Sequence, residues 1–303
     1  MFRSLLVPLD GSRFAEFALP FAASIAKRTG AALHLVRVHL PVRDAAIPGV
    51  ADYDAASRAV ERADLQCVVQ RLQRDWEIGA TLSVEEDPAA QAICARALAV
   101  GADLIVMTSH GRTGVSRLWI GSVADAVVRD AAVPVLLLRP RETTLPIESE
   151  RLFSDILLPL DGSAGAESII PHALALGSLG GARYTLLRVV QPWVTPVVAF
   201  PEVPVPFLDE QVLERSKACA RAYLGSVADR MRAADPSADV RTEVVVHELP
   251  AVAVLDYLQR GEFDLVALTT HGGGLRRLVL GSVADKLLRG AMAPLLIHRP
   301  AAT

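Results

Sequence analysis

Three short segments of the chain combine residue types that could bind a phosphorylated ligand. Asp10-Gly11-Ser12 follows one predicted strand, Thr108-Ser109-His110-Gly111-Arg112 follows another, and Gly121-Ser122-Val123 opens a predicted helix. Glycine lets the backbone approach an anion closely, and the N–H groups of a first helical turn attract negative charge. On the opposite side, the Asp10 carboxylate would accept hydrogen bonds from a base amino group or from ribose hydroxyls. Together the segments predict a nucleotide-shaped site at one edge of a sheet.

Better-known phosphate sites are excluded because their motifs are missing. No G-x-x-x-x-G-K-[ST] is present, which excludes a P-loop NTPase, and no G-x-G-x-x-G follows a strand, which disfavours a dinucleotide dehydrogenase. Single residues keep a second interpretation. Asp10 also suits a simple acid at a helix N-terminus. His110 and His271 are expected to brace their loops rather than to catalyse, and Arg112 either meets a terminal phosphate or lies in solvent.

The chain consists of two copies of one sequence repeat. Pro-Leu-Asp-Gly-Ser at residues 8–12 returns at residues 159–163, and Gly-Ser-Val-Ala-Asp at residues 121–125 returns at residues 281–285. The stretch between the copies is charged and lacks an apolar period, as is typical of a linker. The predicted organisation is a first domain over residues 1–140, a linker over residues 141–151 and a second domain over residues 152–303.

In each copy, short apolar runs alternate with longer amphipathic stretches, a pattern typical of βαβ units around a parallel sheet. The strands are expected at residues 5–9, 33–38, 81–85, 104–107 and 135–138 in the first copy, and at residues 156–160, 184–190, 241–246, 265–268 and 295–298 in the second. Each copy is therefore predicted to be an α/β domain of Rossmann-like type, with an open five-stranded parallel sheet and right-handed crossovers.

Capping residues set the expected helices of the first copy. Ser12 is the expected N-cap of a helix that ends at Gly30, and Asp87-Pro88 is expected to supply the N-cap and first-turn proline of a helix that ends at Gly101. Two further helices are predicted, one over residues 55–78 and one that starts near Gly121.

Composition excludes several classes of protein. The chain has 303 residues, of which 51% are hydrophobic and 21% charged, and its net charge of -3 disfavours a nucleic-acid binder. Every apolar run is shorter than the roughly 18–20 residues that span a bilayer, and the N-terminal apolar stretch is too short for a signal peptide. A cytoplasmic protein without a membrane partner is therefore expected. Cys67, Cys94 and Cys219 lack paired spacing and are expected to be reduced thiols, mostly packed in the interior.

The motifs resemble those of the universal stress protein family, in its nucleotide-binding branch, and the similarity covers nearly the whole chain in both copies. That branch carries G-x2-G-x9-G-[ST] after the fourth strand and an aspartate at the end of the first. Gly111 and Gly121-Ser122 keep the nine-residue spacing, whereas Thr108 stands at the position of the first glycine. In the second copy only eight residues separate Gly272 from Gly281, and a threonine again replaces the first glycine.

The resemblance implies a fold of the adenine nucleotide alpha hydrolase-like type and a set of positions that contact ATP in each repeat. In the first copy these positions are Pro8, Leu9, Asp10, Val38, Met107, Thr108, Gly111, Gly121, Ser122 and Val123, to which Arg112 is added from its place in the loop. In the second copy they are Pro159, Leu160, Asp161, Val189, Thr269, Gly272, Gly281, Ser282 and Val283. The first copy is the better candidate, because one missing residue can displace a helix N-terminus by up to about 3.3–3.6 Å.

The function that the resemblance implies is ATP binding, with or without Mg²⁺, in a stress-response protein with a regulatory or sensing role. Binding rather than catalysis is expected, because the motif assembles no nucleophile, base or metal cluster. Two alternatives stay open. One is a slow ATP hydrolase, with Mg²⁺ held by the phosphates and by Ser122. The other is a nucleotide-free interaction module.

The interaction module would use two surfaces. The proline-rich apolar residues 191–207 are interpreted either as a lid or partner surface or as a crossover loop packed on its own domain. The apolar final strand of each copy is expected to be a sheet edge that needs cover. In the resembled family such strands pair domains or subunits, so the two copies are expected to form a pseudo-dimer, with a homodimer as a further step.

Overall fold

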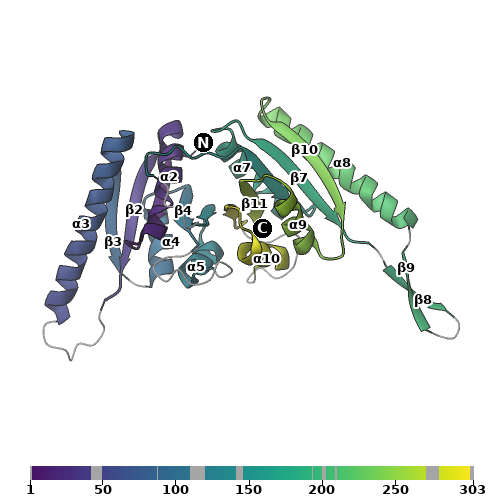
Figure 1. Ribbon diagram of the computed structural model, residues 1–303, viewed down its shortest axis with the longest axis horizontal. Helices are drawn as coiled ribbons and strands as arrows, with labels where there is room; N and C mark the ends of the chain where they lie inside the picture. The colour runs from purple at the N-terminus through teal and green to yellow at the C-terminus, as the bar shows by residue number, and fades with distance from the viewer. Residues whose placement is uncertain are drawn as a thin grey trace. The chain divides into compact units, whose positions relative to one another are not determined.

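The structure is a computed structural model that describes residues 2–41, 50–86, 88–109, 120–140, 146–192, 194–199, 203–208, 210–270 and 280–300 (Figure 1). It divides into two compact units. Unit 1 comprises Met1–Phe153 together with Met292–Thr303, and unit 2 comprises Ser154–Ala291. In both units strands alternate with helices along the chain, as the sequence predicts for an α/β domain.

The elements of unit 1 are, in chain order, β1 (Ser4–Pro8), α1 (Arg13–Glu16), α2 (Leu19–Thr29), β2 (Ala32–His39), α3 (Val50–Trp76), β3 (Ala80–Glu86), α4 (Ala89–Ala99), β4 (Leu104–Thr108), α5 (Ser122–Asp130), β5 (Val135–Leu138) and, near the end of the chain, β12 (Leu295–His298). Its strands lie in the order β12-β5-β4-β1-β2-β3, and β1 to β5 are parallel. Strand order reverses between β1 and β4, which is where open α/β sheets bind ligands at their carboxyl edge.

Helices cover both faces of this sheet. Every residue of β4 and of β5 is buried, although neighbouring residues of a strand point to opposite faces. Helices α2 and α3 contact each other and strands β1 to β3, while α4 and α5 contact each other. Figure 1 shows the long helix α3 running beside β3. The core is built mainly of Leu, Ile, Val and Ala side chains.

The elements of unit 2 repeat this plan. They are β6 (Asp155–Pro159), α6 (Ala164–Glu167), α7 (Ile170–Gly177), β7 (Arg183–Val190), β8 (Val194–Ala199), β9 (Val203–Leu208), α8 (Glu210–Ala234), β10 (Asp239–Val246), α9 (Pro250–Arg260), β11 (Leu265–Thr269) and α10 (Ser282–Gly290). Four parallel strands lie in the order β10-β7-β6-β11, which corresponds to β3-β2-β1-β4 of unit 1. All ten predicted strands are thus present, each within two residues of its predicted bounds.

The helix predicted between Ser12 and Gly30 is instead two helices, α1 and α2. Ser12 is the N-cap as predicted, with its Oγ accepting the Ala15 N–H at 3.1 Å, and Gly30 ends α2 with a left-handed φ of +71°. The break comes at residues 17–18, just before Pro20, whose missing N–H cannot continue the helical ladder.

The start of α4 also differs from the prediction. Pro88 is the N-cap of this helix, with an extended backbone, rather than a residue of its first turn. The helix ends before Gly101, which has a φ of +58°. Asp87 lies outside the described residues.

Residues 191–207, predicted as a loop, contain the two strands β8 and β9. They form a separate antiparallel two-stranded sheet in which Pro196 faces Pro206 and Val198 faces Pro204. The three prolines that lie in these strands therefore fall on alternate pairs of the ladder. Proline has no N–H to donate, so these are the non-hydrogen-bonded pairs, and the strands pair in spite of their proline content.

The last strand, β12, belongs to unit 1 although it completes the second copy in sequence. It pairs antiparallel with β5, with Leu296 opposite Leu136 and Ile297 opposite Val135. This pair joins the final strands of the two copies, so it is separate from the parallel pairing that the sequence predicts within each copy. The apolar edge of β5 is covered by a second apolar strand.

Two further findings concern whole classes of residue. Cys67 and Cys219 are exposed and Cys94 is partly exposed, so the prediction of interior packing is wrong for the first two. All three thiols are free. Within the described part of the chain, no helix combines the length and the apolar character needed to cross a bilayer.

Candidate functional site

The carboxyl ends of β1 and β4, adjacent strands of unit 1, define the candidate site. Both strands continue in hydrogen-bonded form one residue past their ends. The Leu9 N–H donates to the Val36 carbonyl and the Ser109 N–H to the Leu138 carbonyl, each at 2.8 Å. Thr108 and Ser109 are buried. The two strand ends are therefore fixed in position before any loop begins.

Asp10 closes a turn at the end of β1. Its Oδ1 accepts the Ser12 N–H at 2.9 Å, and Ser12 in turn caps α1. Gly11, between them, has a φ of +82°, in the left-handed region that favours glycine. Asp10 thus has the structural role that its sequence position also suits.

Helix α5 begins at the same edge. The Gly121 N–H donates to the Ser109 carbonyl at 2.7 Å, which holds the start of α5 against the end of β4. Gly121 is the N-cap, with no side-chain cap from the part of the chain that the structure describes. Ser122 and Val123 are exposed. N–H groups of a first helical turn, at the positive end of the helix dipole, suit an anion.

The predicted residues of the first copy that the structure describes all lie at the ends of β1, β2 and β4 or at the start of α5. They are Pro8, Leu9, Asp10, Val38, Met107, Thr108, Gly121, Ser122 and Val123. Gly111 and Arg112 lie outside the described residues, as does His110, so their roles stay predictions. No group of three or more His, Cys, Asp or Glu side chains in the described ranges is arranged to hold a metal ion.

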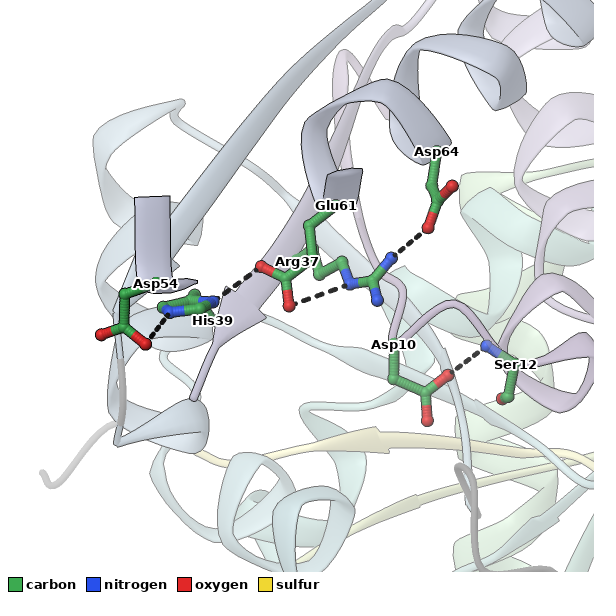
Figure 2. A network of polar contacts seen from close by, with 7 residues as sticks. All are labelled: Asp10, Ser12, Arg37, His39, Asp54, Glu61 and Asp64. Atoms are coloured by element: carbon green, nitrogen blue, oxygen red, sulfur yellow. Dashed lines mark hydrogen bonds and ion pairs between the residues drawn. The ribbon is translucent and has the colours of Figure 1, made fainter. Parts of the chain in front are cut away.

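Sequence reasoning missed two buried polar residues of β2. The side chain of Arg37 is 9% exposed and that of His39 is 3% exposed. Arg37 Nη1 donates to Asp64 Oδ2 at 3.0 Å, and its Nε lies 3.8 Å from Glu61 Oε1. His39 Nδ1 lies 3.0 Å from the other Glu61 oxygen, and Nε2 lies 3.7 Å from Asp54 Oδ1. Figure 2 shows this chain of contacts between β2 and α3, with Asp10 on the nearby turn.

A sequence signal for this cluster does exist. Arg37 and His39 are two residues apart in one strand, so both point to the same face. Asp54, Glu61 and Asp64 are spaced by seven and three residues, which places them on one face of a helix. The signal is visible only once the strand and the helix are assumed to pack together.

The second copy repeats the backbone of the site. Its predicted residues Pro159, Leu160, Asp161, Val189, Thr269, Gly281, Ser282 and Val283 lie at the ends of β6, β7 and β11 or at the start of α10. The Ser163 N–H and Oγ donate to Asp161 Oδ1 at 2.9 and 2.6 Å, and the Gly281 N–H donates to the Thr270 carbonyl at 2.8 Å. Gly272 lies outside the described residues.

The surroundings of that backbone differ. Arg188, which corresponds to Arg37, donates from Nη1 to the Leu160 carbonyl at 3.2 Å. Val190 stands where the first copy has His39. Tyr223 of α8 lies close by, and its burial, reinforced by the nearby Glu167, raises the pKa of its phenol. The acidic cluster of the first copy thus has an apolar and aromatic counterpart.

Comparisons with known proteins agree with this architecture. The model of the universal stress protein family matches residues 1–139 and 153–299. A universal stress protein of Thermus aquaticus is 34% identical over 139 residues, which are 46% of this chain and 100% of that protein. One from Mycobacterium tuberculosis is 28% identical over 200 residues, which are 65% of this chain and 62% of that protein. The crystal structure of one from Archaeoglobus fulgidus shares the fold, with a TM-score of 0.70 at 18% identity, covering 98% of each chain.

Proposed function

The chain belongs to the universal stress protein family, and from that premise we propose that it binds ATP, accompanied by Mg²⁺, in the first repeat. One observation carries the proposal. The hydrogen bond from the Gly121 N–H to the Ser109 carbonyl holds the start of α5 against β4, on the strand adjacent to the one that ends in the Asp10 turn. The family resemblance of the motif supplies the nucleotide, and this geometry supports it.

Each part of the site has a distinct task in the proposed complex. The first-turn N–H groups of α5 and the Ser122 hydroxyl receive phosphate oxygens, with Mg²⁺ neutralising the charge that remains. Asp10 accepts hydrogen bonds from the nucleoside, against the partly exposed Val38. Because the motif does not pair a nucleophile with a base, the proposed output is a bound state that regulates or senses rather than a turnover.

The second repeat is proposed as the weaker site. Its strand ends and the start of α10 carry the same hydrogen bonds, which supports binding. Its glycine loop is one residue shorter, which opposes it. A count of nucleotides per chain separates the two repeats.

We also propose that the final strands join the two copies as a pseudo-dimer. The antiparallel ladder between β5 and β12 supports this arrangement, because its three residue pairs are all apolar. A homodimer would need a further surface. Sedimentation of the full chain tests that step by measuring its mass.

The experiment for the proposed function is native mass spectrometry of the full chain with Mg²⁺ and ATP, followed by titration calorimetry. Gly121→Val places a β-branched side chain at the start of α5 and is expected to abolish binding at the first site. Gly281→Val is the matched change in the second repeat and should leave ATP binding at the first site intact. Loss of binding only in Gly121→Val assigns the ATP to the first repeat. No affinity tighter than millimolar in the wild type would overturn the proposal and favour the nucleotide-free interaction module.

A further inference from the structure

Arg37 is a buried cation with an unusual set of neighbours. Its guanidinium lies between Glu61 and Asp64 of α3, with only 9% of its side chain exposed (Figure 2). Its Nε has no hydrogen-bond partner among the described residues. Taking a guanidinium out of water costs free energy that one good ion pair does not fully return. The position of Arg37 therefore calls for an explanation other than stability.

The guanidinium packs directly under the turn that carries Asp10. A Cβ added to Gly11 would lie 2.9 Å from Arg37 Nη1 and 3.0 Å from Nη2. Real Cβ atoms do not come that close to other heavy atoms, so the guanidinium occupies the space that a side chain at position 11 would need. The backbone of the turn thus rests on Arg37, and Asp10 is the residue immediately before Gly11.

Glu61, in turn, is held from its other side. His39 Nδ1 lies 3.0 Å from Glu61 Oε2, and the imidazole is 3% exposed. Glu61 therefore spans a β2 cation and a β2 imidazole, which leaves it little freedom to rotate. The contacts run from His39 through Glu61 to Arg37, and from Arg37 to the Gly11 turn.

The fold does not need this cluster, as the second repeat shows. Helices α3 and α8 can be aligned through matching ion pairs, because Arg71 contacts Glu16 and Arg230 contacts Glu167. Arg71 and Arg230 are 159 residues apart. The same offset places Leu213, Ala220 and Tyr223 at the positions of Asp54, Glu61 and Asp64.

The consequence is visible at the second turn. A Cβ added to Gly162 would lie 3.7 Å from the Arg188 guanidinium, an ordinary contact, instead of 2.9 Å. Arg188 donates to the Leu160 carbonyl rather than to an acid of the facing helix. A guanidinium paired with acids and packed tightly under the turn is therefore a feature of the first repeat.

We propose that Arg37 is a positioning residue of the first nucleotide site. Held by Glu61 and Asp64, it fixes the turn at Gly11 and with it the direction of the Asp10 carboxylate toward the nucleoside. This inference rests on the proposed function, and it explains why the two repeats should differ in affinity even though their strand ends are alike.

The test is a double-mutant cycle on ATP affinity in the full chain, measured by titration calorimetry. Arg37→Met keeps the length of the side chain and removes its charge, and it is expected to weaken ATP binding about tenfold, or ~1.4 kcal/mol. Asp10→Asn keeps an oxygen for the Ser12 N–H. In that background Arg37→Met should cause little further loss, because its effect acts through Asp10. Combined with Ser122→Ala, its effect should be additive. Arg188→Met is the matched control and should leave the first site unchanged.

Each outcome decides the matter. If the wild type binds no ATP, the proposed function fails. If the wild type binds and Arg37→Met binds equally well, or weakens binding to the same extent with and without Asp10→Asn, the positioning role fails. If Arg37→Met does not fold, Asp64→Ala is the second variant. It removes the exposed carboxylate that lies 3.0 Å from Arg37 Nη1, and it should weaken ATP binding about threefold. Asp52→Ala, an exposed acid on the same helix, should not. Equal affinity of these two variants would overturn the proposal.

Discussion

The two repeats form the same turn but pack different side chains behind it. In both, an aspartate accepts the N–H of the serine two residues later, that serine caps a short helix, and the glycine between them has a left-handed φ, +82° at Gly11 and +86° at Gly162. Behind the first turn lies a guanidinium paired with acids of α3, and behind the second a guanidinium that donates to a backbone carbonyl, beside apolar side chains and one phenol. The conformation of the turn is therefore set by local capping chemistry, whereas the side chains that support it from behind differ between the repeats.

The difference between these side chains also affects stability. Buried ion clusters are often no more stabilising than apolar side chains of the same volume, yet they become costly when one partner is removed. The first repeat has such a cluster and the second does not. Variants that change the side chains behind the turn should therefore affect the stability of the two repeats unequally, and the following predictions are arranged by the size of the expected difference.

The largest difference is expected from Glu61→Ala. Glu61 is 12% exposed and contacts both Arg37 and His39, so its loss leaves a buried cation without one of its counter-charges. We expect unit 1 to lose about 3 kcal/mol of unfolding free energy. The second repeat already has alanine at the corresponding position, Ala220.

Urea unfolding, with hydrogen exchange of β2 and β7 to separate the two units, measures this loss. Asp64→Ala is the control within the cluster, because its carboxylate is 57% exposed and should contribute less than about 1 kcal/mol. Equal protection of β2 in Glu61→Ala and wild type would contradict the view that the cluster is energetically coupled.

High pH should reverse the difference in stability between the repeats, because it destabilises the second repeat. Burial raises the pKa of Tyr184 from 10 to about 12. The same position in the first repeat is Leu33, since Leu33 pairs with Leu5 as Tyr184 pairs with Ile156. Below pH 10 both folded and unfolded chains hold the phenolic proton. Above it the unfolded chain loses the proton first, so stability falls as pH rises from 10 toward 12.

At about 1.36 kcal/mol per pH unit, the phenol should contribute a loss of about 1.4 kcal/mol between pH 9 and pH 11. Urea unfolding at these two pH values measures it. Tyr184→Phe should lack this part of the loss, whereas Tyr53→Phe, at an exposed tyrosine, should behave as wild type. A Tyr184→Phe variant that loses as much stability as wild type would show that the phenol titrates normally.

Local chemistry explains which parts of the structure could be predicted from the sequence. The strands, the Ser12 cap and the Asp10 turn depend on residues within a few positions of one another, so their patterns are legible in the chain. The cluster under the turn is different, because Arg37 and Asp64 are 27 residues apart and meet only when β2 and α3 pack. The antiparallel pairing of β12 with β5 joins residues even farther apart, and no local pattern distinguishes it from a parallel edge.

The smallest difference is expected between Gly11→Ala and Gly162→Ala. Both glycines have a left-handed φ, so alanine should cost each turn about 1 kcal/mol. At Gly162 the new methyl group meets the Arg188 guanidinium at an ordinary 3.7 Å, and no further cost is expected. At Gly11 it would lie 2.9 Å from Arg37, whose head is tied to Asp64 and cannot simply move aside. We expect Gly11→Ala to lower the unfolding free energy of its own unit by about 1 kcal/mol more than Gly162→Ala does, as measured by urea unfolding. An extra cost of this size is typical of modest overpacking.

The excess should vanish in Gly11→Ala combined with Arg37→Ala, because the space is then empty. An equal cost for the two glycine variants would mean that the Arg37 side chain yields without resistance, and the turn of the first repeat would then be no more firmly supported than that of the second.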